Sequence, residues 1–254
     1  MRIKIIGGML ANPAGEKRGR QDVLIEDGVI KAIGQNLGDA DKVIDAAGKT
    51  VFPGFIDLHC HLREPGQEHK EDIASGTRAA AKGGFTGVCC MPNTTPPVDN
   101  AAVCALVLEK ARRASVKVYP VGAATRGLEG RELTEMGELA EMGCVAFSDD
   151  GKPIADDGMM RAAMWYAATF GRFIMAHEED TSISGSGVMN EGYHSTVLGL
   201  PGISRVAEEA MIARDLMLAE AENLHVHIQH VSTAGGVRMI RDAKARGVKV
   251  TCET

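Results

Sequence analysis

Hydrophobic residues follow two different patterns along the chain, and the pattern changes near Gly54. Before this point, short runs rich in β-branched residues occupy 3–8, 22–34 and 42–54 and are broken by Gly-Gly and Asp-Gly turns. Asp27-Gly28 between two apolar runs is typical of a β-hairpin. We therefore expect residues 1–53 to form a small β-rich domain of the β-sandwich type.

From residue 54 onward, short apolar runs alternate with longer segments in which apolar residues recur at helical spacing. The expected strands lie within residues 55–61, 86–92, 117–123, 143–150, 172–178, 225–232 and 248–254. The clearest helical segments between them are residues 100–114, 158–170, 205–222 and 235–247. Strands that alternate with helices in this way indicate βα units and a parallel sheet.

Two α/β folds fit this order, a doubly wound sheet and a (β/α)8 barrel. A barrel closes with eight strands, whereas the pattern contains seven, so a barrel predicts an eighth strand after Thr254. We expect residues 54–254 to form a (β/α)8 TIM-type barrel that is incomplete at its C-terminal end. The chain as printed is then expected to be catalytically incomplete.

Two histidines lie two residues apart at the end of the first expected strand, in the stretch FIDLHCHLREPG. Strand alternation places His59 and His61 on one face, at the carboxyl end where active sites of parallel barrels lie. Such a pair is suited to holding a metal ion, although two core histidines are the commoner explanation of this motif alone. The other strand ends therefore decide between the two interpretations.

Two further expected strands also end in histidine. His177 follows the fifth strand, and His230 follows the sixth. Alternation puts His230 on the side opposite His225 and His227, which we take as surface or packing residues. Ionisable groups thus recur at the edge where a barrel has its active site.

An aspartate at the end of the fourth expected strand completes the set. In GCVAFSDDG, the small Ala146 and Ser148 alternate with bulky residues and should face the crowded barrel interior. Asp150 shares their parity and Asp149 does not, although an ordinary Asp-Gly turn is the commoner explanation of this motif alone. Four histidines and one carboxylate at one rim would form a nitrogen-and-oxygen site suited to zinc, as in a hydrolase that activates water with metal.

Composition narrows the class of partner. The formal net charge is −6 and basic residues are scattered, so no basic stripe favours nucleic acid or an acidic membrane surface. The start of the chain has no signal-peptide pattern, and no apolar run reaches membrane-spanning length. The six cysteines lack the paired spacing of zinc ribbons or disulfide scaffolds. We expect a soluble, cytoplasmic protein with reduced thiols that acts on a small molecule.

Five motifs stand in order at the ends of the first, second, fourth, fifth and sixth expected strands: FPGFIDLHCHLREPG, MPNT, SDDG, AHEED and IQHVST. With these motifs the chain resembles the amidohydrolase superfamily, and within it the long-chain bacterial dihydroorotases. The resemblance spans essentially the whole chain. It implies a zinc-dependent, reversible cyclisation of N-carbamoyl-L-aspartate to dihydroorotate in pyrimidine synthesis.

The resemblance also implies roles for the site residues. His59 and His61 would bind one zinc, His177 and His230 would bind a second, and Asp150 would bridge them, with one or two zinc ions per subunit. Many relatives use a carboxylated lysine as the bridge, but AFSDDG contains no lysine and is similar to a bacterial subset that uses aspartate. Spacing back from His177 also selects Asp150. In the family an eighth-strand aspartate ligates metal and shuttles the proton.

Arg63 follows the two histidines at the same spacing. Its planar guanidinium can hold a carboxylate through two parallel hydrogen bonds. The resemblance implies that Arg63 and Asn93 bind the substrate carboxylate. The alternative for Arg63 is a surface ion pair with Glu64 or Glu68.

Two other functions remain open. An allantoinase or hydantoinase would use the same metals with a different substrate clamp. A non-catalytic dihydroorotase-like subunit would instead serve as a scaffold for aspartate transcarbamoylase, but such homologues lose metal ligands that this chain retains. The sequence leaves open whether the protein forms a homo-oligomer or associates with aspartate transcarbamoylase.

Overall fold

The structure is a computed structural model that describes residues 1–11 and 19–254. The chain divides into two compact units, Met1–Phe55 and Ile56–Thr254, and each is described by itself. None of the helices in the described ranges is long and apolar enough to cross a membrane.

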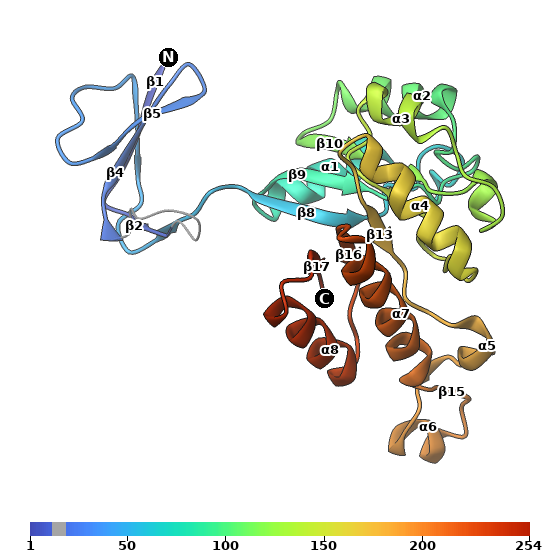
Figure 1. The fold of residues 1–254 in the computed structure, drawn as a ribbon. Helices are drawn as coiled ribbons and strands as arrows, with labels where there is room; N and C mark the ends of the chain where they lie inside the picture. The colour runs from blue at the N-terminus through green and yellow to red at the C-terminus, as the bar shows by residue number, and fades with distance from the viewer. Residues whose placement is uncertain (12–18) are drawn as a thin grey trace. The chain divides into compact units, whose positions relative to one another are not determined.

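The first unit consists of short strands in two sheets (Figure 1). Its strands are β1 (Arg2–Ile6), β2 (Met9–Leu10), β3 (Gly19–Arg20), β4 (Asp22–Glu26), β5 (Val29–Gly34), β6 (Lys42–Asp45) and β7 (Thr50–Val51). One sheet has the order β5-β4-β1-β6 and the other the order β3-β2-β7. Asp27 and Gly28, with φ of 49° and 81°, join β4 to β5 as an antiparallel pair. The predicted hairpin is confirmed, because both residues adopt the left-handed backbone of a tight two-residue turn.

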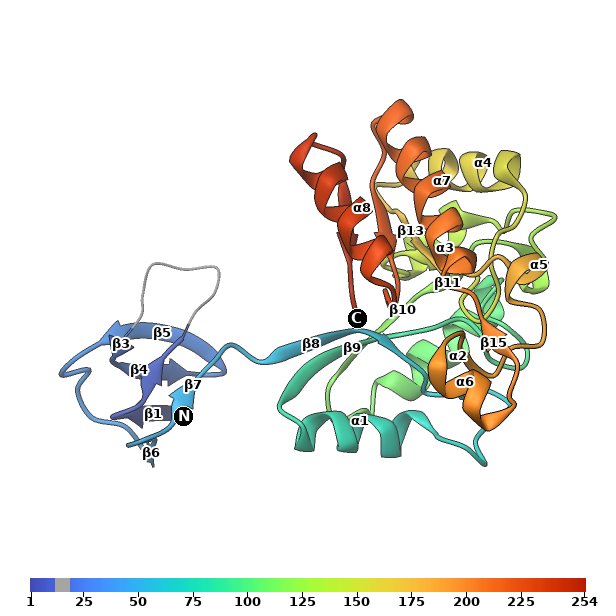
Figure 2. The same cartoon turned by 90° about the horizontal axis from the view of Figure 1, so that it is seen from below.

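The second unit alternates parallel strands with helices (Figure 2). Its main strands are β8 (Phe55–Cys60), β9 (Phe85–Cys90), β10 (Lys117–Pro120), β11 (Gly122–Ala123), β12 (Phe147–Ser148), β13 (Ile174–Ala176), β16 (Val226–Ile228) and β17 (Val250–Cys252). Its helices are α1 (Ile73–Lys82), α2 (Ala101–Ala111), η1 (Arg126–Leu128), α3 (Met136–Met142), α4 (Asp157–Thr169), α5 (Thr181–Ser184), α6 (Tyr193–Leu198), α7 (Val206–Glu222) and α8 (Ala234–Ala245). Each of the seven predicted strand segments contains a strand, and each of the four predicted helical segments contains a helix.

Neighbouring strands of the second unit follow one another in chain order. The sheets have the orders β10-β9-β8 and β11-β12-β13-β16-β17. Backbone hydrogen bonds at Val121 and Gly122 link the two sheets. Val121 N donates to Cys90 O and Gly122 N donates to Ala146 O, both at 3.0 Å. The carboxyl ends of all these parallel strands therefore lie at one edge of the sheet, the position of active sites in α/β folds of this kind.

Alternate strand residues pack into two different cores. Phe147 and Ile174 belong to the large cluster that the strands form with the helices. Ala146 and Met175 belong to a smaller cluster on the opposite face of the strands. The predicted alternation in the fourth strand is therefore confirmed, with the small Ala146 on the crowded face.

Polar side chains define where several helices begin. Asp72 accepts a hydrogen bond from Ser75 N at 2.7 Å at the start of α1, and Asp156 accepts one from Met159 N at the same distance at the start of α4. These caps satisfy backbone N–H groups that lack an acceptor within the helix. Asp72 and Asp156 thus fix the residues at which α1 and α4 begin.

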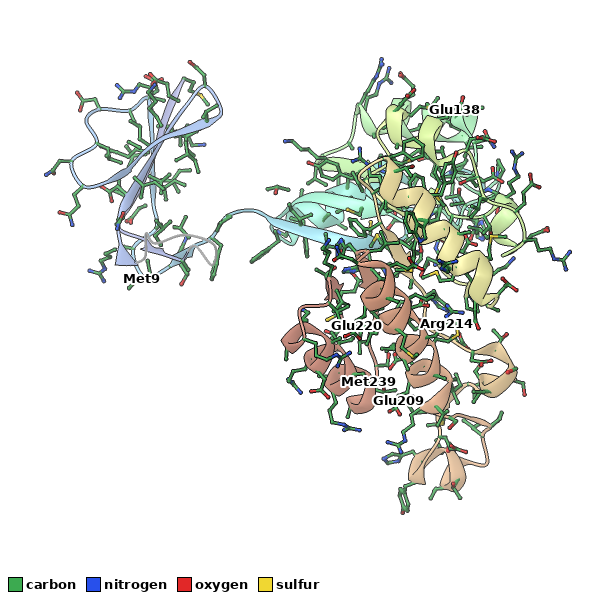
Figure 3. All side chains as sticks on the ribbon, in the orientation of Figure 1. Met9, Glu138, Glu209, Arg214, Glu220 and Met239 are labelled. Carbon is green, nitrogen blue, oxygen red and sulfur yellow. The ribbon has the colours of Figure 1, made fainter. Side chains whose placement is uncertain are left out.

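Helices α7 and α8 lie side by side in both ribbon views (Figures 1 and 2). Met239 of α8 packs against the large core, and Glu220 of α7 pairs with Arg246 at 2.8 Å (Figure 3). Between β13 and α7, the chain forms an excursion of α5, α6, β14 (Met189–Asn190) and β15 (Gly202–Ile203), in which the two strands pair in parallel. This excursion brings Asn190 and Ile203 beside one another.

Asp149 fastens the end of β12 to the segment that follows β11. One carboxylate oxygen accepts hydrogen bonds from the backbone N–H groups of Ala124 and Thr125, each at 2.9 Å, and the other accepts one from the Thr125 hydroxyl. Ala124 and Thr125 are fully buried. Because a buried N–H group without an acceptor is costly, this carboxylate stabilises the rim on which Asp150 lies.

Replacing Asp149 by alanine is therefore expected to lower the free energy of unfolding by about 2–5 kcal/mol, because two buried N–H groups lose their acceptor. Denaturation with urea measures the change. Asp242→Ala, which removes an exposed carboxylate from α8, is the matched control and should change stability by less than about 0.5 kcal/mol. Equal stability of the two variants would contradict the bracing role of Asp149.

Candidate metal centre

Asp150 lies among four histidines that come from three other strand ends. His59 Nε2 is 3.3 Å from its Oδ1, and His61 Nε2 is 3.5 Å from its Oδ2. On the other side, His177 Nδ1 and His230 Nε2 lie 3.5 and 3.7 Å from Oδ1. The structure thus brings together all five residues that the sequence singles out as metal ligands.

Strand geometry explains how these side chains meet. His59 and His61 are two apart at the end of β8, so both project from the same face. His177 directly follows β13, and Asp150 lies two residues beyond β12. Asp149, the neighbouring carboxylate, points instead to the backbone after β11. Of the two aspartates, the parity of the strand therefore selects Asp150 for the centre.

The predicted parity of the sixth strand is wrong. His230 has φ of +35°, a left-handed conformation that is uncommon for a residue with a side chain. This turn brings His230 back to the face of the sheet on which His227 also lies, although alternation places the two on opposite faces. His227 is buried, and its Nε2 lies 3.4 Å from Glu253 Oε2 at the edge of the centre.

The donor atoms form two groups that share Asp150. One group is His59, His61 and Asp150, and the other is Asp150, His177 and His230; within each, the donor atoms lie within 4.8 Å of one another. Two ligands at about 2.0–2.1 Å from a tetrahedral zinc ion lie about 3.3–3.4 Å apart.

The first group fits this spacing closely. His59 Nε2 and His61 Nε2 are 3.3 Å apart, and both lie at nearly the same distance from the carboxylate. The second group is less even, with 2.9 Å between His177 Nδ1 and His230 Nε2. The imidazole and carboxylate donors of both groups are of the type that zinc binds in proteins.

Three of the four histidines have a partner on the ring nitrogen that faces away from Asp150. His59 Nδ1 lies 2.6 Å from Glu253 Oε1, and His61 Nδ1 lies 3.0 Å from Asn93 Oδ1. His177 Nε2 lies 3.4 Å from a carboxylate oxygen of Glu179. A partner of this kind fixes the tautomer, so that the other ring nitrogen presents its lone pair to the centre.

Glu253 and Glu179 are two contributors that the sequence analysis does not identify. Glu179 follows His177 by two residues, so the same parity that selects the histidine also points to this carboxylate. Glu253 directly follows β17, and an ionisable residue at a strand end is the same signal that identifies His177 and Asp150. Its contact with His59 joins strand ends 194 positions apart in sequence, a distance over which no local pattern acts.

The charge distribution of the centre favours a cation. Burial alone would raise the pKa of Asp150, but the neighbouring imidazoles of His177, His230 and His59 hold it well below its usual range. Burial likewise opposes the charged form of His59, but the neighbouring carboxylates of Asp150 and Glu253 raise its pKa to about 9. Asp150 therefore stays ionised, and positive charge placed beside it is stabilised.

Glu253 adds a second negative charge at the edge of the same centre. Its burial would raise its pKa, but the neighbouring imidazoles of His227 and His59 hold the value at about 2. His61 behaves differently: burial lowers its pKa, against the attraction of Asp150, and the positive charge of Arg63 lowers it further. An uncharged imidazole is the form in which histidine binds a metal ion.

Arg63 and Asn93 lie at the mouth of the centre. Asn93 bridges two of the central side chains, because its Oδ1 faces His61 and its Nδ2 donates to Asp150 Oδ2 at 3.1 Å. Arg63 is partly exposed and has φ of +60°. Its guanidinium is close enough to His61 to influence the pKa of that imidazole.

The two acidic residues that follow Arg63 are engaged elsewhere. Glu64 accepts a hydrogen bond from Ile73 N at 3.0 Å and pairs with Lys110 at 2.9 Å. Glu68 accepts a hydrogen bond from Gly66 N at 2.8 Å. Within the described residues, neither carboxylate forms an ion pair with Arg63. The guanidinium is thus available to an anion from solution.

Close packing holds the loop that carries Arg63 against the loop that carries Asn93. A Cβ on Gly66, where φ is +89°, would lie 1.9 Å from the carbonyl oxygen of Thr95. Gln67 Nε2 donates to Asn93 O at 3.2 Å and to the Thr95 hydroxyl at 3.3 Å. Glycine is required here because no side chain fits between the two loops.

A cavity of about 360 Å³ adjoins the second donor group. It is lined by His177 and His230 from the centre and by Asn190, Ile203 and Arg205 from the excursion before α7. A small organic substrate can therefore reach both the histidines and polar side chains of this excursion.

Comparison with known proteins agrees with this geometry. Residues 48–235 match the family of dihydro-orotase-like proteins. A dihydroorotase of Trichlorobacter lovleyi is 53% identical over 257 residues, and one of Pelotomaculum thermopropionicum is 54% identical over 254 residues. Each comparison covers 100% of this chain and 60% of the relative. The chain thus spans 60% of the length of these curated relatives.

A solved structure supports the fold. The L-hydantoinase (dihydropyrimidinase) from Arthrobacter aurescens matches with a TM-score of 0.80 and 24% identity, over 99% of this chain and 58% of that one. At this identity the likeness concerns the fold alone, a parallel α/β architecture. The match over residues 48–235 shows that the chain belongs to the dihydro-orotase-like family.

Proposed function

We propose that the protein to which this chain belongs is a metal-dependent dihydroorotase. It would interconvert N-carbamoyl-L-aspartate and (S)-dihydroorotate, a step of pyrimidine biosynthesis. The observation that carries the proposal is the convergence of four histidines on Asp150, with Arg63 unpaired by its acidic neighbours at the mouth of the same centre. Identity of 53% and 54% to proteins named dihydroorotase supports this choice of reaction.

The proposed cofactor is zinc, with one or two ions per subunit. His59, His61 and Asp150 would hold one ion, and Asp150, His177 and His230 would hold the second. A zinc ion bound in such a site polarises a carbonyl oxygen and lowers the pKa of water, so that a nucleophile forms at neutral pH. The less even spacing of the second group supports tighter binding in the first.

In the hydrolytic direction, water adds to a ring carbonyl carbon and the ring C–N bond breaks, with one proton passing to the leaving nitrogen. Asp150 stays ionised among the four histidines and would stabilise the positive charge of a metal ion held there. Asn93 Nδ2 keeps one carboxylate oxygen of Asp150 in place. Asp150 and Asn93 together would hold the metal site in a fixed orientation toward the substrate. Such fixed orientation contributes a large part of catalysis.

Arg63 would bind the carboxylate of dihydroorotate, and Asn93 would contribute a polar contact beside it. A guanidinium can donate two parallel hydrogen bonds to a carboxylate, which gives both affinity and orientation. The engagement of Glu64 with Ile73 and Lys110 supports this role, because it leaves Arg63 available. A cyclic amidase for uncharged rings has no need of such a clamp.

The proposal also includes the fold, the cellular location and the partners of the protein. We propose that residues 54–254 belong to a (β/α)8 barrel and that residues 1–53 form a β-sandwich-like domain. The sequential strand order supports the barrel. The protein would act in the cytoplasm on a small-molecule substrate, and association into a homo-oligomer or with aspartate transcarbamoylase rests on the family resemblance alone.

Asp150→Asn tests the bridging role of the carboxylate. The amide keeps the size of the side chain but removes the negative charge, so bound zinc and turnover should both be lost. Asp242→Asn, which changes an exposed carboxylate on α8, is the matched control and should leave zinc content unchanged. Zinc is measured by mass spectrometry after dialysis of the full-length protein. Full occupancy and normal turnover in Asp150→Asn would show that another residue is the bridge.

Arg63→Met tests the substrate. Loss of two charge-assisted hydrogen bonds of about 3 kcal/mol together should lower kcat/KM for dihydroorotate roughly 150-fold. Zinc content should not change. Arg63→Lys keeps the charge but not the two-pronged geometry, so its rate should fall between those of the parent and Arg63→Met.

Dihydrouracil, which lacks the carboxylate, is the control substrate for this experiment. It should be hydrolysed poorly by the parent and no more slowly by Arg63→Met. Equal activity of the parent on both rings, or normal activity of Arg63→Met on dihydroorotate, would rule out the clamp. Either result would favour a cyclic amidase of the hydantoinase type that acts on an uncharged ring.

A further inference from the structure

The carboxylate of Glu253 connects a proposed metal ligand to a buried histidine. Its Oε1 lies 2.6 Å from His59 Nδ1, and its Oε2 lies 3.4 Å from His227 Nε2. In the described parts of the chain, the ion pairs of Glu253 involve these two imidazoles and no Lys or Arg. The carboxylate therefore acts on histidine rings and is not part of a surface salt bridge.

We propose that Glu253 is a positioning residue for His59 and, through it, a determinant of metal affinity; this inference rests on the proposed metal centre. An ionised carboxylate only accepts hydrogen bonds, so His59 Nδ1 must carry the proton. A metal ion that replaces the proton on His59 Nε2 then meets the lone pair of this atom, which lies 3.3 Å from both Asp150 Oδ1 and His61 Nε2. Glu253 thus fixes both the tautomer and the ring orientation that a metal ion requires.

Glu253 is itself held in place by residues of β16 and β17. His227 and Thr251 are paired in the register of these strands, and His227 Nδ1 lies 2.8 Å from the Thr251 hydroxyl. Among the residues that the structure describes, the buried His227 Nε2 has no hydrogen-bond partner, and Glu253 Oε2 lies 3.4 Å away. This distance is slightly longer than an ordinary N–H···O bond, so a small shift of either group completes it.

Donors and acceptors in this series of side chains can be assigned in one direction. His225 Nε2 lies 2.9 Å from the Thr251 hydroxyl on the side away from His227. If His225 donates to Thr251, Thr251 donates to His227 Nδ1, which leaves a proton on His227 Nε2 to face Glu253. Glu253 accepts from His59, and a small shift would let it accept from His227 as well. His225 and His227, expected to be surface or packing residues, thus support the centre.

Glu253 also completes a pattern among the four histidines. His61 is oriented by the neutral Asn93 and His177 by the more exposed Glu179, whose oxygen is 3.4 Å away. His59 has the shortest outer contact of the three and a partner that carries a full charge. A carboxylate in this position raises the basicity of the imidazole as well as orienting it. Loss of Glu253 should therefore weaken metal binding more than loss of a purely structural contact.

The test compares zinc affinity of the full-length protein and three variants by competition with a chromophoric chelator. Glu253→Ala should bind zinc about 10–100-fold more weakly, and Glu253→Gln, which keeps an acceptor oxygen, should lose less. Glu222→Ala is the matched control: its carboxylate is 19% exposed, against 18% for Glu253, and lies 2.6 Å from Arg161 Nε. Its zinc affinity should equal that of the parent.

The visible spectrum of the cobalt-substituted protein is a second readout, and a general loss of stability would not change it. The visible spectrum of the cobalt-loaded protein should change in Glu253→Ala and stay unchanged in Glu222→Ala. Only Glu253 contacts a proposed metal ligand, His59. Zinc affinity within twofold of the parent in Glu253→Ala, or an equal fall in Glu222→Ala, would overturn the positioning role. A parent protein that binds no zinc at His59 would overturn the metal centre itself, which separates the two failures.

Discussion

The negative charge of Asp150 is the constraint on which the arrangement of the strand ends depends. Its side chain is 4% exposed, and a carboxylate buried to this degree is costly unless positive or hydrogen-bonding groups surround it. Four imidazoles from β8, β13 and β16 supply these groups. The left-handed backbone of His230 is tolerated because the turn brings its ring to this carboxylate.

The same carboxylate organises the groups around it in successive layers. His59 and His61 face Asp150 through one ring nitrogen and are held through the other, by Glu253 and Asn93. Asn93 also belongs to the loop that packs on Gly66, so the segment that carries Arg63 is fixed relative to the metal centre. In the proposed function, the binding of substrate by Arg63 and of metal by the histidines would therefore depend on one set of contacts.

Much of the fold and the candidate ligand set could be predicted from the sequence, because both depend on local periodicity. Alternation within β8 and β12 selects His59, His61 and Asp150, and parallel strands bring their ends together whatever the loops do. The parity of His230 could not be predicted, since its positive φ arises from tertiary packing and not from a glycine. Glu253 was missed for a related reason: its contact with His59 spans 194 positions, and no pattern along the chain records it.

Anomalous diffraction at the zinc edge, from crystals of the zinc-loaded full-length protein, tests the central claim most directly. If Asp150 is the shared ligand, anomalous density will lie between its carboxylate and the pair His59 and His61, and, where a second ion is bound, between it and the pair His177 and His230. The ring of His59 will keep its contact with Glu253. Zinc bound elsewhere, or an Asp150 carboxylate turned away from the histidines in the loaded protein, would contradict the proposed centre.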